Sequence, residues 1–215
     1  MPEIISKYRA LYQHIRHNVD SSDGPFLIGI AGPPATGKST LAERLVNDLN
    51  ASGVQSNYCP MDGFHFSNRQ LEQFGSKHLK GHIDTFNASK FVESVQQLKA
   101  KGTFWWPLYS RHIHDPVPEG VKIRGTEKVF IIEGNYVLDS NEPWRSAALM
   151  LELSIFVDVP DVLLRERLEQ RHQKSGRTVQ EAFKKIENID MPNARYVRSH
   201  HLEADVYFRV NYSDF

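Results

Sequence analysis

The chain has a single cysteine, no net charge and no long apolar run. Cys59 is the only cysteine among 215 residues, so no internal disulfide can form, as expected in a reducing compartment. The 26 basic and 26 acidic side chains cancel, which removes the general attraction to nucleic acid or to an anionic membrane. No stretch approaches the ~20 apolar residues of a transmembrane helix, and the charged N-terminal segment does not resemble a signal peptide. We therefore expect a cytoplasmic protein with no nucleic-acid or membrane partner.

Short runs that are apolar on both faces alternate with amphipathic segments, as in parallel sheets whose strands are connected by helices. Residues 62–86 and 103–127 lack a clear period and are expected to be irregular, with one short helix near Gln70. The pattern predicts one α/β domain, residues 1–215, with a doubly wound, mainly parallel sheet and helices on both faces. The expected strands are 26–31, 54–61, 128–134, 153–159 and 206–210. The expected helices are 3–18 (within an N-terminal helical segment 1–22), 39–50, 87–102, 161–174 and 178–200.

One motif, "GPPATGKS" at residues 32–39, fits the pattern G-x-x-x-x-G-K-[ST] and lies between an expected strand and an expected helix. Its glycines permit a tight turn whose backbone N–H groups can point at phosphate oxygens, and the helix N-terminus adds partial positive charge. Lys38 would reach the β- and γ-phosphates. The sequence therefore predicts a P-loop NTPase fold. The expected nucleotide-binding residues are Gly32, Pro33, Pro34, Ala35, Thr36, Gly37, Lys38, Ser39 and Thr40.

A second acid is expected near the phosphate loop to help hold a metal ion. Glu133 ends the apolar run 128–134, and P-loop proteins place such an acid at a strand C-terminus. An acid that merely ends a strand is the simpler alternative. Beside a phosphate loop the metal role is favoured, so Ser39 and Glu133 are the predicted Mg²⁺ ligands.

The stretch "MDGFHF", residues 61–66, places Asp62 at the end of the second expected strand, the edge where doubly wound sheets bind ligands. A carboxylate there can accept the proton of an attacking hydroxyl group. An ordinary Asp-Gly turn is the alternative explanation.

Residues 161–177 form a strongly basic segment that is expected to act as a helical lid over the phosphates. Guanidinium groups stabilise charge on a phosphoryl group during transfer. Interleaved Glu166 and Glu169 leave open that this is only a solvated helix face.

The phosphate loop, the acid and the basic lid together predict a small-molecule kinase. A regulatory GTPase would carry an N-K-x-D motif, which this chain lacks. The remaining alternative is a nucleotide-binding regulatory NTPase without a small-molecule acceptor.

Several segments resemble the uridine kinase, phosphoribulokinase and bacterial pantothenate kinase group of P-loop kinases. The resemblance spans about residues 26–210 and is strongest to an uncharacterised bacterial branch labelled nucleoside kinase-like or fructose transport system kinase-like. The segments that support it are "MDGFHF", "KGHIDTF" (80–86), "PLYSRHIHDPVP" (107–118) and "VFIIEGNYVL" (129–138).

The resemblance implies a kinase that uses ATP and Mg²⁺ to phosphorylate a hydroxyl group of a sugar, a nucleoside or a pantothenate-like molecule. It implies Asp62 as the catalytic base, with Lys38, Arg165 and Arg171 near the transferred phosphate and Arg167 on the nucleotide. The group often forms dimers or tetramers, so a homodimer is one expectation. The identity of the acceptor and the choice of ATP over GTP stay open. The acceptor-side residues implied by the resemblance are Phe64, His65, Asp84, Tyr109, Arg111 and His114.

Overall fold

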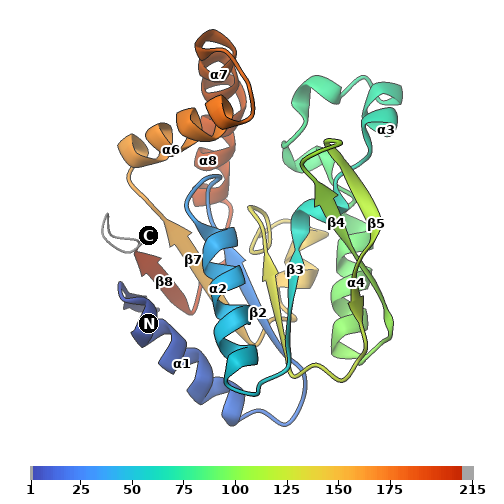
Figure 1. Ribbon diagram of the computed structural model, residues 1–215, viewed down its shortest axis with the longest axis vertical. Coiled ribbons are helices and arrows are strands. Elements are labelled where there is room, and N and C mark those ends of the chain that lie inside the picture. Colours follow the sequence, from blue (N-terminus) through green and yellow to red (C-terminus); the bar gives the residue numbers. More distant parts are fainter. Residues whose placement is uncertain (1, 210–215) are drawn as a thin grey trace.

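The computed structural model describes residues 2–209, and a parallel sheet forms the centre of this part of the chain (Figure 1). Its strand order is β1-β8-β7-β2-β6-β3, and every neighbouring pair is parallel. The central strands β2 and β6 are buried along their whole length because their residues are apolar on both faces. This confirms the predicted α/β class. Within residues 2–209 the sheet contains β1 (Glu3–Ile5), β2 (Phe26–Ala31), β3 (Ser56–Pro60), β6 (Val129–Glu133), β7 (Leu153–Asp158) and β8 (Val206–Arg209).

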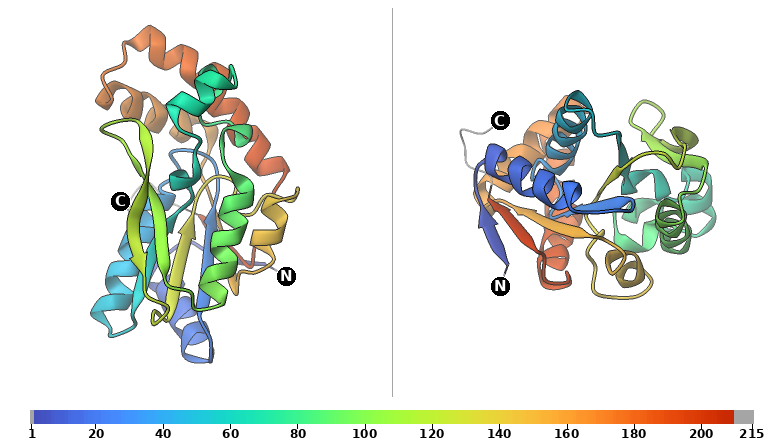
Figure 2. Two further views of the ribbon diagram at one scale, coloured as in Figure 1. Left: turned by 90° about the vertical axis from the view of Figure 1, so that its right-hand side faces the viewer. Right: turned by 90° about the horizontal axis from the view of Figure 1, so that it is seen from below.

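Helices cover both faces of the sheet, as predicted (Figure 2). On one face α1, α2 and α6 bury leucines such as Leu11, Leu45 and Leu164 against the sheet. On the other face α4 and α5 contribute Phe91 and Trp144. Each such side chain stabilises the fold by roughly 1.5–3 kcal/mol on burial. None of the helices in residues 2–209 is long and apolar enough to cross a membrane. The helices of the described chain are α1 (Tyr8–Asp20), α2 (Lys38–Ala51), α3 (Asn68–Gln73), α4 (Ala88–Lys99), α5 (Trp144–Ala148), α6 (Asp161–Lys174), α7 (Val179–Lys185) and α8 (Met191–Ser199).

The N-terminal segment differs from the prediction of one helix over residues 3–18. Residues 3–5 form the edge strand β1, which pairs in parallel with β8, and the helix begins only at Tyr8. Ile5 is buried at this edge, and β-branched residues suit a strand. The strand depends on a partner that lies about 200 residues later in the chain, which local periodicity does not reveal. The expected last strand, 206–210, also ends at a residue outside the described part.

Residues 103–127 were expected to be irregular, and this prediction was wrong. They form an antiparallel hairpin of β4 (Phe104–Ser110) and β5 (Asp115–Ile123) outside the main sheet. The hairpin lies beside α4 (Figure 2). Prolines within the strands conceal the strand pattern, since proline usually argues against a paired strand. Here the ladder shifts register between Trp106 and Leu108, around Pro107, which accommodates the missing N–H group.

The helical segment expected over residues 178–200 is interrupted. A π-helical turn, η4 (Ile186–Asp190), separates α7 from α8. The buried His172 on α6 lies 2.7 Å from Asp190, measured from Nε2 to Oδ2. This contact ties the turn to the basic helix, so α6, α7 and α8 form one connected group above the sheet (Figure 1).

Candidate active site

The phosphate loop joins β2 to α2 at the carboxyl edge of the sheet (Figure 1). A Cβ atom at Gly32 would lie 2.0 Å from the carbonyl oxygen of Val157, so only glycine fits there. Gly37 has φ of 97° and directly precedes α2. Within residues 2–209, the backbone N–H groups of Ala35 and Gly37 have no hydrogen-bond acceptor. The loop therefore presents free donors at a helix N-terminus, which suits a phosphate group.

The Lys38 side chain is buried beneath this loop. Its Nζ donates hydrogen bonds to the carbonyl oxygen of Pro33 (2.7 Å) and to Oδ1 of Asn135 (3.0 Å). Burial lowers the pKa of Lys38 to about 8, while the nearby carboxylates of Glu133 and Asp62 act in the opposite direction. The ammonium group therefore remains mainly protonated at neutral pH, as phosphate binding requires. The sequence analysis did not identify Asn135 as its partner.

Glu133 lies next to Ser39 and is buried at the end of β6. The Ser39 hydroxyl donates to Oε2 of Glu133 over 3.1 Å, and the Tyr58 hydroxyl donates to the same oxygen over 2.8 Å. Burial raises the pKa of Glu133, and Lys38 opposes that shift. A hydroxyl and a carboxylate side by side are oxygen donors of the kind that Mg²⁺ prefers. Ser39 and Glu133 therefore fit Mg²⁺. Tyr58 was missed because a tyrosine in a strand is ordinarily a packing residue.

Asp62 lies in η1 (Met61–Phe64), a 3₁₀ turn that directly follows β3. A Cβ atom at Gly63 would lie 2.0 Å from the carbonyl oxygen of Pro107, so the glycine is required by close packing against β4. The Asp-Gly pair is thus more than an exchangeable surface turn. Burial raises the pKa of Tyr109 to about 12, and the negative charge of Asp62 contributes to this shift. The same charge favours the protonated form of Lys38. Asp62 thus lies on a turn that follows the end of β3 and packs against the hairpin, and its charge acts on side chains of both the phosphate loop and the hairpin.

His65, three residues after Asp62, lies on the side of the site that faces the hairpin. Its ring contacts Phe86 edge-on, with centroids 3.7 Å apart, and lies 5.3 Å from the ring of Tyr109. Its Nδ1 is buried and has no hydrogen-bond partner in the described part of the chain. Burial lowers the pKa of His65 to about 4, although Asp62 opposes this shift. The imidazole is therefore neutral at pH 7 and has an unused nitrogen.

Three of the other acceptor-side residues lie at the surface. Arg111 and His114 are exposed in the turn of the hairpin, where His114 has φ of 53°. The Asp84 carboxylate is 81% exposed and lies 3.2 Å from Nδ1 of His82. The structure thus brings His65 and Tyr109 together near Asp62 and places Asp84, Arg111 and His114 around the rim.

Phe64 departs from the prediction that it lines the acceptor site. It is 2% exposed, and its ring packs edge-on against Phe91 and Trp106. Its role is to anchor η1 to the core, since an aromatic side chain contributes most when it is fully buried.

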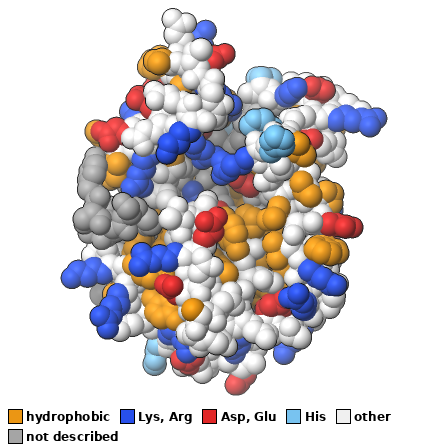
Figure 3. Space-filling view, viewed as in Figure 1, with side chains coloured by type: hydrophobic (Ala, Val, Ile, Leu, Met, Phe, Trp, Pro, Cys, Tyr) orange, Lys and Arg blue, Asp and Glu red, His pale blue; other side chains and the backbone are white. Residues whose placement is uncertain are grey.

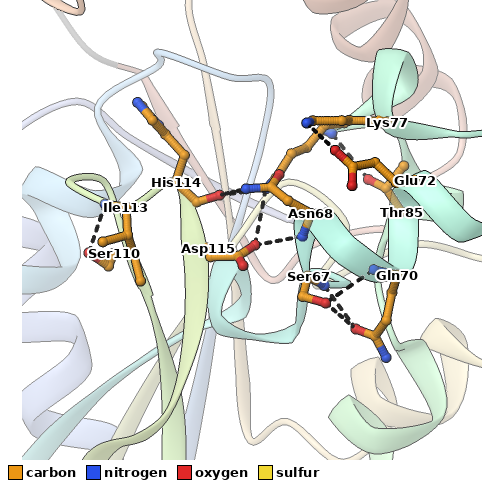
Figure 4. A network of polar contacts seen from close by, with 12 residues as sticks. Ser67, Asn68, Gln70, Glu72, Lys77, Thr85, Ser110, Ile113, His114 and Asp115 are labelled. Carbon is orange, nitrogen blue, oxygen red and sulfur yellow. Dashed lines mark hydrogen bonds and ion pairs between the residues drawn. The ribbon is translucent and has the colours of Figure 1, made fainter.

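A polar network connects the hairpin turn to the N-terminus of α3 (Figure 4). The backbone N–H of Asn68 donates to Oδ1 of Asp115 (2.7 Å), and its side-chain amide donates to the carbonyl oxygen of His114 (3.0 Å). Lys80 Nζ reaches the same carbonyl oxygen (2.6 Å) and also Oδ1 of Asn68 (2.7 Å). A capping box between Ser67 and Gln70 begins α3 in the same place. The network fixes the loops around the predicted acceptor residues, and its contacts between distant segments cannot be recognised in the sequence.

The basic helix α6 approaches the phosphate loop. Arg167 donates from Nη1 to the carbonyl oxygen of Thr36 over 3.1 Å. Arg171 also acts on Lys38, whose pKa is lowered first by burial and further by this neighbouring cation. Figure 3 shows Lys and Arg side chains gathered around the hollow between the α6 side and the α3 side. Arg167 thus contacts the phosphate loop directly, and the charge of Arg171 acts on Lys38, while their predicted contacts with phosphate oxygens stay a prediction.

Arg165 differs from the two arginines that follow it on α6. Its guanidinium group pairs with Glu187 of η4, and its side chain is 41% exposed. This ion pair holds α6 against η4. Within the described residues Arg165 contacts Glu187 and makes no hydrogen bond with the phosphate loop. The predicted role of Arg165 beside the transferred phosphate therefore has no supporting contact among the described residues and stays a prediction.

The fold and the phosphate loop define a P-loop kinase. The model of the Phosphoribulokinase / Uridine kinase family matches residues 27–213, and the chain belongs to this family. Kinases of the family use ATP with Mg²⁺, which confirms the cofactors expected from the sequence.

Three similar proteins illustrate the relationship. The uncharacterized protein YggC of Escherichia coli (strain K12) is 35% identical over 184 residues, which cover 84% of this chain and 76% of YggC. The provisionally named uridine kinase C227.14 of Schizosaccharomyces pombe is 31% identical over 191 residues, which cover 84% of this chain and 81% of that protein. A crystal structure from Silicibacter sp. TM1040, provisionally assigned as a fructose transport system kinase, is 32% identical with a TM-score of 0.88 and covers 95% of this chain and 100% of that one.

Proposed function

We propose that the protein is an ATP- and Mg²⁺-dependent kinase of the cytoplasm that phosphorylates a hydroxyl group of a small metabolite. The acceptor would be a sugar, a nucleoside or a pantothenate-like molecule, and one domain, residues 1–215, would contain the whole site. The observation that supports this most directly is the place of Asp62 in η1, the turn that follows β3 at the same edge of the sheet as the phosphate loop and packs against the hairpin strand β4. A protein that only binds and senses a nucleotide has no need of a carboxylate there.

In this proposal Asp62 accepts the proton of the acceptor hydroxyl and orients its oxygen toward the γ-phosphorus. The bond between this oxygen and the γ-phosphorus forms while the bond from that phosphorus to the bridging oxygen breaks, and ADP leaves. Lys38, Arg167 and Arg171 stabilise the negative charge on the phosphoryl oxygens. Ser39 and Glu133 would hold Mg²⁺, which neutralises phosphate charge when bound.

The acceptor would meet the neutral His65 and the Tyr109 hydroxyl. The unpartnered Nδ1 of His65 supports this assignment, because a buried nitrogen without a partner is costly unless a ligand satisfies it. Asp84, Arg111 and His114 are exposed and would contact the acceptor from the rim.

The test is ADP release from Mg·ATP, and in parallel from Mg·GTP, across a panel of sugars, sugar acids, nucleosides and pantothenate. We expect one compound to raise ADP release well above the rate without acceptor and to gain one phosphoryl group, as detected by mass spectrometry. If the protein binds Mg·ATP but no compound raises the rate, the result contradicts the proposal and favours a nucleotide-binding regulatory NTPase.

A further inference from the structure

The segment 80–85, termed here the acceptor segment, is held by the helices of the lid side. Lys185, the last residue of α7, donates from Nζ to the carbonyl oxygen of Lys80 over 2.8 Å. Asn193 of α8 donates from its side-chain amide to the carbonyl oxygen of Gly81 over 2.9 Å. The Tyr136 hydroxyl donates to this second carbonyl oxygen over 3.0 Å. Two consecutive carbonyl groups of the segment are therefore bound by side chains from α7, α8 and the turn after β6.

The hairpin side holds the same segment through the side chain of Lys80. Its Nζ binds Asn68 and the carbonyl oxygen of His114, and it lies 3.7 Å from Oδ1 of Asp115. Lys80 thus connects two parts of the molecule, because its carbonyl oxygen accepts from the lid side while its ammonium group donates to the hairpin side. Asp84 follows four residues later in the same segment.

The surroundings of Lys185 are unfavourable for a residue that serves only stability. Burial lowers its pKa, and the neighbouring cations Arg177 and Arg171 lower it further, while Asp190 acts in the opposite direction. Within the described residues, its ammonium group donates a hydrogen bond to a carbonyl oxygen and not to a carboxylate. Asn193 is likewise buried, at 5% exposure, yet it donates to a loop. The cost of burying Lys185 is typical of a functional site, whereas the buried amide of Asn193 is satisfied by the carbonyl oxygen of Gly81.

A continuous set of contacts links these two residues to the nucleotide site. Arg167 of α6 binds the carbonyl oxygen of Thr36 in the phosphate loop. His172 of the same helix contacts Asp190 of η4, the turn that separates α7 from α8. Lys185 ends α7 just before this turn, and Asn193 lies in the first turn of α8 just after it. A shift of α6 toward bound phosphates would therefore move both donors.

We propose that Lys185 and Asn193 are positioning residues that hold the acceptor segment, and Asp84 with it, against the lid helices. The arrangement of the lid then determines whether the acceptor site is formed. This inference rests on the proposed kinase function, since an acceptor segment has meaning only if there is an acceptor.

The first test is hydrogen exchange of the backbone amides of Gly81, His82 and Thr85, which donate to acceptors within residues 79–85. The full chain is measured with and without Mg²⁺ and the ATP analogue AMP-PNP. We compare Lys185→Met and Asn193→Leu with Lys184→Met, which removes an exposed lysine of the same helix. We expect exchange about tenfold faster in the first two variants, the effect of losing one strong hydrogen bond, and wild-type exchange in Lys184→Met. Wild-type exchange in both Lys185→Met and Asn193→Leu would overturn the inference.

The second test separates positioning from simple structural support. Once the panel has identified the acceptor, Lys185→Met is expected to raise the KM for the acceptor about tenfold. The reason is again the loss of one hydrogen bond to a charged group. The KM for ATP and the hydrolysis of Mg·ATP without acceptor should stay within about twofold. Lys185→Arg, which retains a donor, should restore most of the acceptor KM. An equal rise in the KM for ATP, or no change in either KM, would overturn the inference. If no acceptor is found, the proposed function fails while the exchange measurement still decides the contact.

Discussion

The nucleotide side and the acceptor side of the site are built in different ways. The nucleotide side uses regular elements, the ends of β2 and β6 and the start of α2, and its polar residues Thr36, Lys38 and Glu133 are buried. The acceptor side uses 3₁₀ turns and the turn of a hairpin, and Asp84 and Arg111 are exposed. A triphosphate is the same for every kinase, so its binding site can be rigid. Loops on a rigid scaffold can vary, so the difference locates the choice of acceptor in segments whose sequence can change without loss of the fold.

The largest effect is expected at the boundary between the two sides. Asp62→Asn should reduce phosphoryl transfer at least ~100-fold, because the amide cannot accept the hydroxyl proton. The affinity for Mg·AMP-PNP, measured by calorimetry, should change little because the phosphate loop is intact. Unchanged turnover would remove Asp62 from the mechanism, and a lost nucleotide affinity would assign it to the nucleotide side.

On the acceptor side, the buried His65 should make the free energy of unfolding depend on pH in the acidic range. His65 has a pKa of about 4 in the folded protein, below the ordinary value near 6.5 of the unfolded chain. The unfolded state therefore binds the proton first as pH falls. The contribution of neutral His65 to the free energy of unfolding should be fully present above pH ~6.5. As this contribution is lost, the free energy of unfolding should fall by up to ~3 kcal/mol by pH ~4.

Urea denaturation between pH 4 and 7 measures this effect. His65→Asn should lose this part of the pH dependence, while His112→Asn, in the exposed hairpin turn, should keep the wild-type profile. Equal slopes for wild type and His65→Asn would show that His65 is not held neutral by burial.

On the nucleotide side, the affinity for Mg·AMP-PNP should instead depend on pH in the alkaline range. The pKa of Lys38 is about 8, and only the ammonium form attracts phosphate. Binding of Mg·AMP-PNP should therefore be constant below pH ~7 and should weaken about tenfold per pH unit above ~8, or ~1.4 kcal/mol per unit. Calorimetry in buffers of different ionisation enthalpy should detect proton uptake. Lys38→Arg should give a flat profile, whereas a flat wild-type profile up to pH 9 would contradict the lowered pKa.

The smallest effect is expected at Arg165, which lies on the basic helix but outside both sides of the site. Arg165→Met removes an exposed ion pair with Glu187, which is worth less than ~1 kcal/mol. Turnover should change less than about threefold. Arg167→Met is the matched variant and should weaken nucleotide binding more strongly, since Arg167 contacts the phosphate loop. A larger loss for Arg165→Met than for Arg167→Met would reverse this assignment.

The parts of the molecule that the sequence predicts well are those fixed by local chemistry. The runs at 26–31 and 128–134 become central strands because residues apolar on both faces must be buried. The motif at residues 32–39 specifies its own turn through its two glycines. Asn87, a residue type that favours helix N-termini, caps α4 by accepting a hydrogen bond from the backbone N–H of Lys90.

The parts that could not be predicted depend on partners far away in the sequence. β1 exists because β8 lies beside it, and β4 and β5 pair despite their prolines. Phe64 lies two residues after Asp62 in the sequence but points into the core, since only contacts with Phe91 and Trp106 decide its direction. Lys185 resembles any other helix lysine until its contact with Lys80 is known.

The short strand β1 has a practical consequence for solubility. Its three residues cover the outer edge of β8, where the backbone N–H of Glu3 also donates to the carbonyl oxygen of Asp205. A chain that began at Tyr8 would keep every helix and the pairing of β8 with β7, but it would leave the outward-facing N–H and C=O groups of β8 unpaired. An open parallel edge is a template for another chain. Truncation of seven residues far from the phosphate loop should therefore appear as aggregation during purification, with nucleotide affinity preserved in the fraction that stays in solution.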